Sequence, residues 1–274
     1  MRTNLGKASA KRGIFGCPVD TVCEVGHDIF VLRFLSPEIA HATLPGQFVN
    51  IRVAAGYVPL LRRPFSVYRT EGKSVEIIFN TVGRGTQILS RKKAGDRIDV
   101  MGPLGHPYGF DDGFKTALLV AGGLGVAPLP MITKFVANAE KQIITFLGAR
   151  SRNQIVTDYL ENLLLATDDG SEGFGGTVVE LMASHLAARK FDRPKIFACG
   201  PNIMLKHLAE LAASYSISCE VSLECAMACG IGICQGCPVE LMDEYRRSLD
   251  GQKKYGLVCT EGPVFDAREV CVAG

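Results

Sequence analysis

The sequence lacks both a strong charge of one sign and any long apolar run. Its 30 Lys and Arg residues balance 28 Asp and Glu residues, and no basic run is long enough to indicate nucleic-acid binding. The longest apolar runs, such as residues 117–121, are far too short to span a bilayer. The basic N-terminal stretch is followed by no apolar segment, so we expect neither a signal peptide nor an anchor there. These absences predict a cytoplasmic chain that binds neither nucleic acid nor membrane.

Catalytic sets of the hydrolytic kind are missing as well. No Ser/His/Asp set and no carboxylate pair stand out, and the histidines show no metal-ligand spacing. We interpret all five as structural or surface residues: His27, His41, His106, His185 and His207. The sequence therefore gives no indication of nucleophilic hydrolysis.

The chain contains enough residues for two domains and an appendage. Its 274 residues are 47% hydrophobic and 21% charged, as in globular proteins. Short segments between Gly, Pro and charged breaks predict strands at 29–34, 48–53, 65–68, 75–80 and 97–101. Such closely spaced short strands are typical of a small antiparallel barrel.

A second pattern, in which strands and helices alternate, follows from about residue 115. We predict strands at 117–121, 143–147 and 196–199, and helices at 129–139, 154–165 and 202–214. This alternation indicates a parallel α/β sheet. The fold class is therefore β plus α/β, with a tail at 1–15, a barrel domain at 16–110, a nucleotide-binding α/β domain at 111–219 and a loop-rich, cysteine-bearing segment at 220–274.

The cysteines of the last segment have a distinctive spacing. The reducing cytosol disfavours disulfides, so crowded cysteines there point to a metal site. The run Cys229-x4-Cys234-x2-Cys237, with Cys259 after 21 further residues, is the spacing of plant-type [2Fe–2S] proteins. A structural zinc site is the alternative, but zinc prefers two short Cys pairs and only one is present. We interpret Cys225, four residues before the first of these, as a bystander thiol.

Three further segments suggest nucleotide and flavin binding. A glycine loop, Gly122-Gly123-Leu-Gly125-Val-Ala-Pro128, lies between a predicted strand and a predicted helix, where backbone amides can face a pyrophosphate. In the barrel half, Arg63-Pro-Phe-Ser66 offers an arginine for a phosphate and a serine for a flavin edge. Residues 83–86, Gly-Arg-Gly-Thr, look like a helix start and a second anion site. Each of these three segments is common in proteins, but their order along the chain, flavin-type segments before the glycine loop, makes them informative about function.

Together these segments resemble the ferredoxin–NADP reductase superfamily over nearly the whole chain. More closely, the chain is similar to the family of electron-transfer subunits of class B dihydroorotate dehydrogenases. The RPFS and GRGT segments resemble the flavin motifs, and the GGLGVAP loop with Cys199-Gly200-Pro201 resembles the nicotinamide half. The most specific part is MACGIGICQGCPVEL…GLVCTEGPVFDAREV.

The resemblance implies residue roles. FAD would be bound by residues of the barrel half: Arg63, Pro64, Phe65, Ser66, Ile78, Phe79, Asn80, Gly85 and Thr86. A nicotinamide dinucleotide would be held by Gly122, Gly123, Gly125, Pro128, Gly200 and Pro201, with Cys199 approaching its ring as the catalytic residue. The [2Fe–2S] cluster would be held by Cys229, Cys234, Cys237 and Cys259. At Cys225 a polar residue would be expected.

The resemblance also implies a partner and a pathway. A separate FMN-containing catalytic subunit would oxidise dihydroorotate in pyrimidine biosynthesis, in a heterotetramer of two plus two subunits, and electrons would pass through the cluster and FAD to NAD. Hydride transfer needs no obligatory general acid or base, which fits the missing catalytic sets. We further expect the loop at 230–236 to lie at the surface and contact this partner, because Ile231 and Ile233 are uncharged.

Two other functions remain open at this point. The chain would also suit a small subunit of a sulfide dehydrogenase or an NADPH–ferredoxin oxidoreductase, or a non-catalytic zinc-binding regulator on a reductase-like scaffold. The acidic residue that usually selects NAD, about 20 residues after the glycines, is missing. Arg150, close to that position, suits either a 2′-phosphate or the adenine, and only the resemblance favours NAD.

Overall fold

The computed structural model describes residues 12–110, 112–249 and 253–272. Its N-terminal part closes into an antiparallel barrel, which confirms the predicted barrel, with strand order β1-β2-β5-β4-β3-β6. Inward-facing side chains such as Leu32, Val49 and Ile77 are fully buried in one core, because alternate residues of each strand point into the barrel. The strands are β1 (Gly13–Gly26), β2 (Ile29–Leu35), β3 (Phe48–Arg52), β4 (Arg63–Glu71), β5 (Ser74–Asn80) and β6 (Arg97–Leu104).

The predicted N-terminal tail, 1–15, overlaps the barrel. Residues 1–11 of that tail lie outside the described residues. Strand β1 already begins at Gly13, which pairs with Gly102 of β6. The end of the predicted tail is therefore part of the barrel wall.

The middle of the chain forms a sheet of order β10-β9-β8-β7-β11-β12-β15. All of its strand pairs are parallel except the last, between β12 and β15, so the predicted parallel sheet is confirmed. Strand β7 is an unbroken run of buried residues up to its last position, as expected of a strand covered on both faces. The strands are β7 (Thr116–Gly122), β8 (Gln142–Ala149), β9 (Leu163–Thr167), β10 (Phe174–Gly175), β11 (Pro194–Cys199), β12 (Ser218–Ser222) and β15 (Val264–Asp266).

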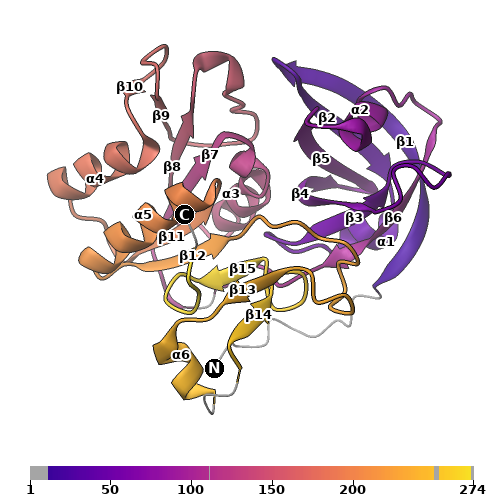
Figure 1. Ribbon diagram of the computed structural model, residues 1–274. Helices are drawn as coiled ribbons and strands as arrows, with labels where there is room; N and C mark the ends of the chain where they lie inside the picture. Colours follow the sequence, from indigo (N-terminus) through magenta and orange to yellow (C-terminus); the bar gives the residue numbers. More distant parts are fainter. Residues whose placement is uncertain (1–11, 111, 250–252, 273–274) are drawn as a thin grey trace.

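Helices cover both faces of this sheet (Figure 1). Helix α3 packs in one core cluster, and helices α4 and α5 pack in the other. The α-helices are α1 (Pro37–Ala42), α2 (Arg84–Ser90), α3 (Leu129–Ala137), α4 (Val178–Ala188), α5 (Asn202–Ser214) and α6 (Asp243–Ser248), and the 3-10 helices are η1 (Gly123–Val126) and η2 (Arg152–Gln154). In the part of the chain that the structure describes, none of the helices has the length and apolarity needed to cross a membrane.

The predicted helix at 154–165 is wrong. Its first residue closes η2, and the apolar residues at its end belong to β9, which pairs with β8 in the sheet. Between them Tyr159 and Asn162 have φ values of +63° and +49°, which a right-handed helix does not allow. Conversely, our prediction missed α4, although Thr177 and Glu180 form a capping box that marks its start.

The C-terminal segment is attached to both halves of the molecule. Its hairpin joins β13 (Pro238–Glu240) to β14 (Tyr255–Leu257), and β15 extends the large sheet. Cys237 and Cys259 share a buried core with Phe48 of the barrel and Val221 of the sheet. Figure 1 shows this segment, in yellow, beneath the junction of barrel and sheet. The position of its cysteines relative to both halves is therefore fixed by packing.

Candidate functional site

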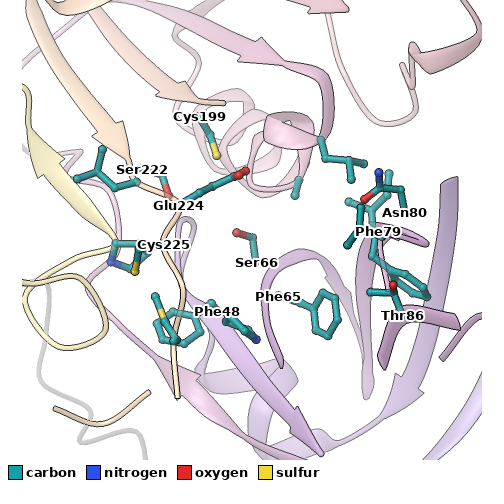
Figure 2. Close-up of a pocket in the computed structure, with 18 residues that line it drawn as sticks. Phe48, Phe65, Ser66, Phe79, Asn80, Thr86, Cys199, Ser222, Glu224 and Cys225 are labelled. Atoms are coloured by element: carbon teal, nitrogen blue, oxygen red, sulfur yellow. The ribbon is translucent and has the colours of Figure 1, made fainter. Parts of the chain in front are cut away.

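A cavity of about 310 Å³ opens between the barrel and the large sheet. Figure 2 shows its lining, with barrel residues on one side and Cys199 on the other. Because β4 and β5 are neighbours in the barrel, the start of β4 and the end of β5 present their side chains together. The predicted flavin-binding residues that line the cavity are Pro64, Phe65, Ser66, Ile78, Phe79, Asn80 and Thr86.

Arg63 and Gly85, the remaining predicted flavin residues, lie next to each other at the edge of this group. A Cβ atom on Gly85 would sit 3.1 Å from Nε of Arg63. The Arg63 guanidinium donates to the carbonyl of Leu61 at 2.7 Å. The hydroxyl of Thr86 donates to the carbonyl of Gly83 at 3.0 Å and so fixes the first turn of α2. A guanidinium held beside a glycine of the first helical turn suits a phosphate group.

The predicted nicotinamide residues lie where the glycine loop at the end of β7 contacts the turn after β11. This contact is at the carboxyl ends of the two strands. A Cβ on Gly125 would lie 2.1 Å from the carbonyl oxygen of Cys199, and one on Gly122 would lie 3.1 Å from Cδ of Pro201. Side chains are thus excluded where the glycine loop meets the turn after β11. Gly123 differs, because it has φ +54° and a Cβ there would meet nothing within 4 Å. This backbone is open to a ligand.

The other residues of the glycine loop and of the turn after β11 pack around this contact. Gly200, with φ +156°, places its Cα so close that an added Cβ would be 3.0 Å from the amide nitrogen of Gly122. Pro128 occupies the N-cap of α3, where it closes the glycine loop. Leu124 and Ala127 of this loop reach the cavity directly.

Cys199 ends β11 and faces the cavity with only 3% of its surface exposed. Burial, and then the charge of Glu224, raise the pKa of its thiol far above the ordinary value. The side chain is therefore a neutral thiol at physiological pH. It suits contact with a planar ring better than nucleophilic attack, which requires the thiolate.

The sequence analysis assigned no cofactor contact to several of the lining residues. They come from β3, from the loop after β5, from the end of β12 and the segment after it, and from the position before β15: Phe48, Val82, Ser222, Leu223, Glu224, Cys225, Met227 and Pro263. Glu224 exposes its carboxyl to the cavity, and burial by the surrounding walls raises its pKa. The sequence could have indicated the residues after β12, because the residues that follow neighbouring parallel strands lie together at the carboxyl edge of the sheet. Strand β12 is the neighbour of β11.

The predicted cluster cysteines lie in two linked pairs. The amide of Cys234 donates to Sγ of Cys229 at 3.4 Å, and the amide of Cys259 donates to Sγ of Cys237 at 3.5 Å. Over the described ranges, no three His, Cys, Asp or Glu side chains form a group that could hold a single metal ion. A binuclear centre needs two thiolates on each iron, and two pairs fit that requirement.

The electrostatics of the first pair favour a bound cationic centre. Partial burial opposes ionisation of Cys229, but hydrogen bonds from the amides of Cys234 and Ile231 lower its pKa to about 6. Such amides also stabilise sulfur ligands once a metal is bound. Gly230 and Gly232 make this loop possible with φ values of +74° and +84°. The donor set therefore fits an iron–sulfur cluster.

The cluster loop is fixed on the barrel and open on its outer side. Nδ2 of Asn50, a fully buried residue of β3, donates to the carbonyl of Cys229 at 3.3 Å. Ile231 is 44% exposed and Ile233 is 77% exposed, which confirms the predicted surface position of the loop. The buried pair, Cys237 and Cys259, lies on the inner side.

The chain is similar to known proteins over most of its length. Residues 224–271 match the iron–sulfur cluster binding domain of dihydroorotate dehydrogenase B. The "Dihydroorotate dehydrogenase B (NAD(+)), electron transfer subunit" of Desulforamulus reducens is 38% identical over 94% of this chain and 98% of its own length. The subunit of the same name from Geobacillus thermodenitrificans is 37% identical over 85% of this chain and 88% of its own length.

Solved structures of similar fold cover most of the chain. A structure of an NADH-dependent reduced ferredoxin-NADP oxidoreductase superposes with a TM-score of 0.81 at 33% identity, over 93% of this chain and 89% of the other. Phthalate dioxygenase reductase superposes with a TM-score of 0.59 at 17% identity, over 78% of this chain and 70% of the other. The second likeness concerns the fold alone.

Proposed function

The chain belongs to the family of dihydroorotate dehydrogenase B electron-transfer subunits, and from this premise we propose how its residues perform electron transfer. As a flavin and iron–sulfur component of an NAD-linked oxidoreductase, it works with FAD, a [2Fe–2S] cluster and NAD. Electrons from dihydroorotate oxidation in a catalytic FMN subunit pass through the cluster and FAD to NAD⁺. The observation that carries the proposal is one cavity whose lining joins the flavin residues, Cys199 and the segment leading into the cluster loop.

In this proposal the barrel side of the cavity holds the FAD. Ser66 and Asn80 offer polar groups to the flavin edge, and Phe65 and Phe79 cover its apolar part. Arg63, with Gly85 and Thr86 beside it, binds the pyrophosphate. When bound, the flavin exchanges a hydride with nicotinamide and single electrons with the cluster.

The sheet side of the cavity receives the nicotinamide dinucleotide. Its backbone contacts are Gly122, Gly123, Gly125, Pro128, Gly200 and Pro201. The neutral Cys199 thiol packs against the nicotinamide ring on the wall opposite Ser66 (Figure 2). The backbone of Gly125 packs closely against that of Cys199, so this wall has no room for a side chain at Gly125.

The cluster is held by Cys229, Cys234, Cys237 and Cys259. Amide hydrogen bonds lower the pKa of Cys229 and so favour the thiolate that a metal requires. Zinc remains the alternative occupant for a chain with another function, and it is distinguished by colour. A zinc protein is colourless, whereas FAD with iron and sulfide makes the protein yellow-brown.

The catalytic FMN subunit is the partner that this proposal requires. We place its contact on the cluster loop, where exposed Ile231 and Ile233 lack charge. We also propose a cytoplasmic heterotetramer of two subunits of each kind.

Reconstitution with the catalytic subunit tests this function. The purified chain should show flavin and iron–sulfur absorption and reduce a dye with NADH. Mixed with the FMN subunit, it should couple dihydroorotate oxidation to NAD⁺ reduction. A chain that instead reduces ferredoxin or polysulfide, and leaves the FMN subunit uncoupled, would belong to the sister function favoured by the 33% identical ferredoxin-linked structure.

A further inference from the structure

Cys225 occupies a place that the ligand set does not require. It follows β12 by three residues and lines the cofactor cavity together with Phe48 and Met227. Figure 2 shows it on the wall opposite Phe79 and Thr86. A thiol at this position faces whatever fills the barrel side of the cavity.

On its other side, Cys225 packs toward the predicted cluster cysteines. Its thiol is a close neighbour of the Cys237 thiol. Both residues pack in the core that also contains Cys259. Cys237 is 3% exposed and Cys259 is 2% exposed, so this contact is made on the buried side of the cluster loop.

The two sides of the cluster loop therefore differ. The outer pair, Cys229 and Cys234, is carried by the loop that exposes Ile231 and Ile233. Cys225 packs against the core that contains the inner pair, Cys237 and Cys259, and it also lines the cofactor cavity. An electron that crosses between the cavity and the cluster by the inner side encounters this side chain.

We propose that Cys225 is a positioning residue for the inner half of the cluster: its S–H group donates a hydrogen bond to Sγ of Cys237 and fills the space between that ligand and the flavin. This inference rests on the proposed function. A donor to a ligand sulfur stabilises the reduced, more negative cluster and thereby raises its reduction potential. One electron moves, and no bond forms or breaks at Cys225.

Substitutions of Cys225 in the holoprotein test the hydrogen bond. Cys225→Ala removes the donor and should lower the cluster's reduction potential in an EPR-monitored redox titration, while flavin and cluster content stay unchanged. Cys225→Ser keeps a donor and should hold the potential near that of the parent. A tenfold change in the reduction equilibrium corresponds to 59 mV for one electron, well within the resolution of such a titration.

Cys271→Ala is the matched control. Cys271 is another partly buried thiol of the C-terminal segment, but its sulfur contacts Sδ of Met242 and none of the cluster cysteines. This variant should leave the potential unchanged.

Labelling tests the second half of the proposal. Burial raises the pKa of the Cys225 thiol, so labelling is done at alkaline pH, where a thiolate is available. Iodoacetamide should then modify Cys225 faster in flavin-depleted protein than in the holoprotein, whereas exposed Cys23 on the barrel should react equally in both. Protection of Cys225 by FAD supports its place between flavin and cluster, and equal reaction with and without FAD overturns it.

The remaining outcomes separate this inference from the proposed function. An unchanged potential in Cys225→Ala, or an equal drop in Cys225→Ser, refutes the hydrogen bond but leaves the function intact. Loss of the cluster from Cys225→Ser refutes it too, because Cys225 would then be a ligand. A parent protein without iron and flavin refutes the proposed function itself.

Discussion

Replacing Gly125 by alanine tests how tightly the two halves of the nicotinamide site are coupled. The added Cβ would lie 2.1 Å from the carbonyl oxygen of Cys199, 2.5 Å from its carbonyl carbon and 2.7 Å from Cα of Gly200. All three are backbone atoms, so no side-chain rotation relieves the clash. The closest contact must lengthen to about 3.4 Å, the start of ordinary van der Waals contact.

The expected magnitude follows from that displacement. Overpacking of a buried site costs about 1–3 kcal/mol, and we expect the upper part of this range because the backbone itself must move. The movement separates the glycine loop from Cys199, and a misplacement of about 1 Å near reacting groups lowers the rate roughly 100-fold. Gly125→Ala should therefore lower both the urea midpoint and kcat/KM for NADH-dependent dye reduction.

Two further glycines serve as controls. Gly56→Ala adds a Cβ that meets nothing within 4 Å at a residue without positive φ, and its stability should stay within about 0.5 kcal/mol of the parent. Gly123→Ala also enters open space, but its φ of +54° costs about 1–2 kcal/mol and its Cβ stands where we place the dinucleotide. It should raise KM for NADH more than it lowers kcat. A Gly125→Ala protein with parental stability and parental kcat/KM would refute the reasoning.

Three other changes test the remaining parts of the site. Serine at any one of the four cluster cysteines should abolish the iron–sulfur absorption and EPR signal while FAD stays bound, and an intact signal would remove that residue from the ligand set. Arg63→Ala should weaken FAD binding, measured as retention during dialysis, by about 1.5–3 kcal/mol, the scale of a hydrogen bond to a charged group. Arg63→Lys should weaken it less. Equal flavin content in the parent and both variants would argue against a phosphate contact. Ile231→Glu should leave NADH-to-dye activity intact but impair binding of the catalytic subunit, measured by gel filtration. The control Val25→Glu, at a similarly exposed position on β1, should assemble normally. Normal assembly of Ile231→Glu would exclude the loop from the interface.

The architecture was largely predictable because it depends on local patterns. Alternating and continuous apolar runs distinguish the barrel strands from the buried strands of the parallel sheet, as β7 illustrates. The helix predicted at 154–165 failed because its apolar residues at 163–165 gain more from pairing with β8 than from helix propensity. A positive φ at Tyr159 and Asn162 is also invisible in a hydropathy pattern.

The chemistry of the cluster was determined by the sequence alone, because ligand type and spacing are local properties of the chain. Four thiols in that spacing, with glycines between them, predict a loop around two irons. Which side of the loop faces inward was decided only by tertiary structure. Burial of Cys237 and Cys259 depends on a core shared with Phe48, which lies almost two hundred residues earlier in the chain.

Tertiary structure likewise decided that one cavity joins most of the predicted flavin residues with Cys199, Glu224 and Cys225. These residues come from strands of the barrel and from neighbouring ends of β11 and β12, and no spacing in the sequence relates them. Their pKa shifts are of the same origin, since the burial that keeps Cys199 neutral is created by elements packed around it. The sequence determines which groups can react, and packing between distant segments determines which of them meet.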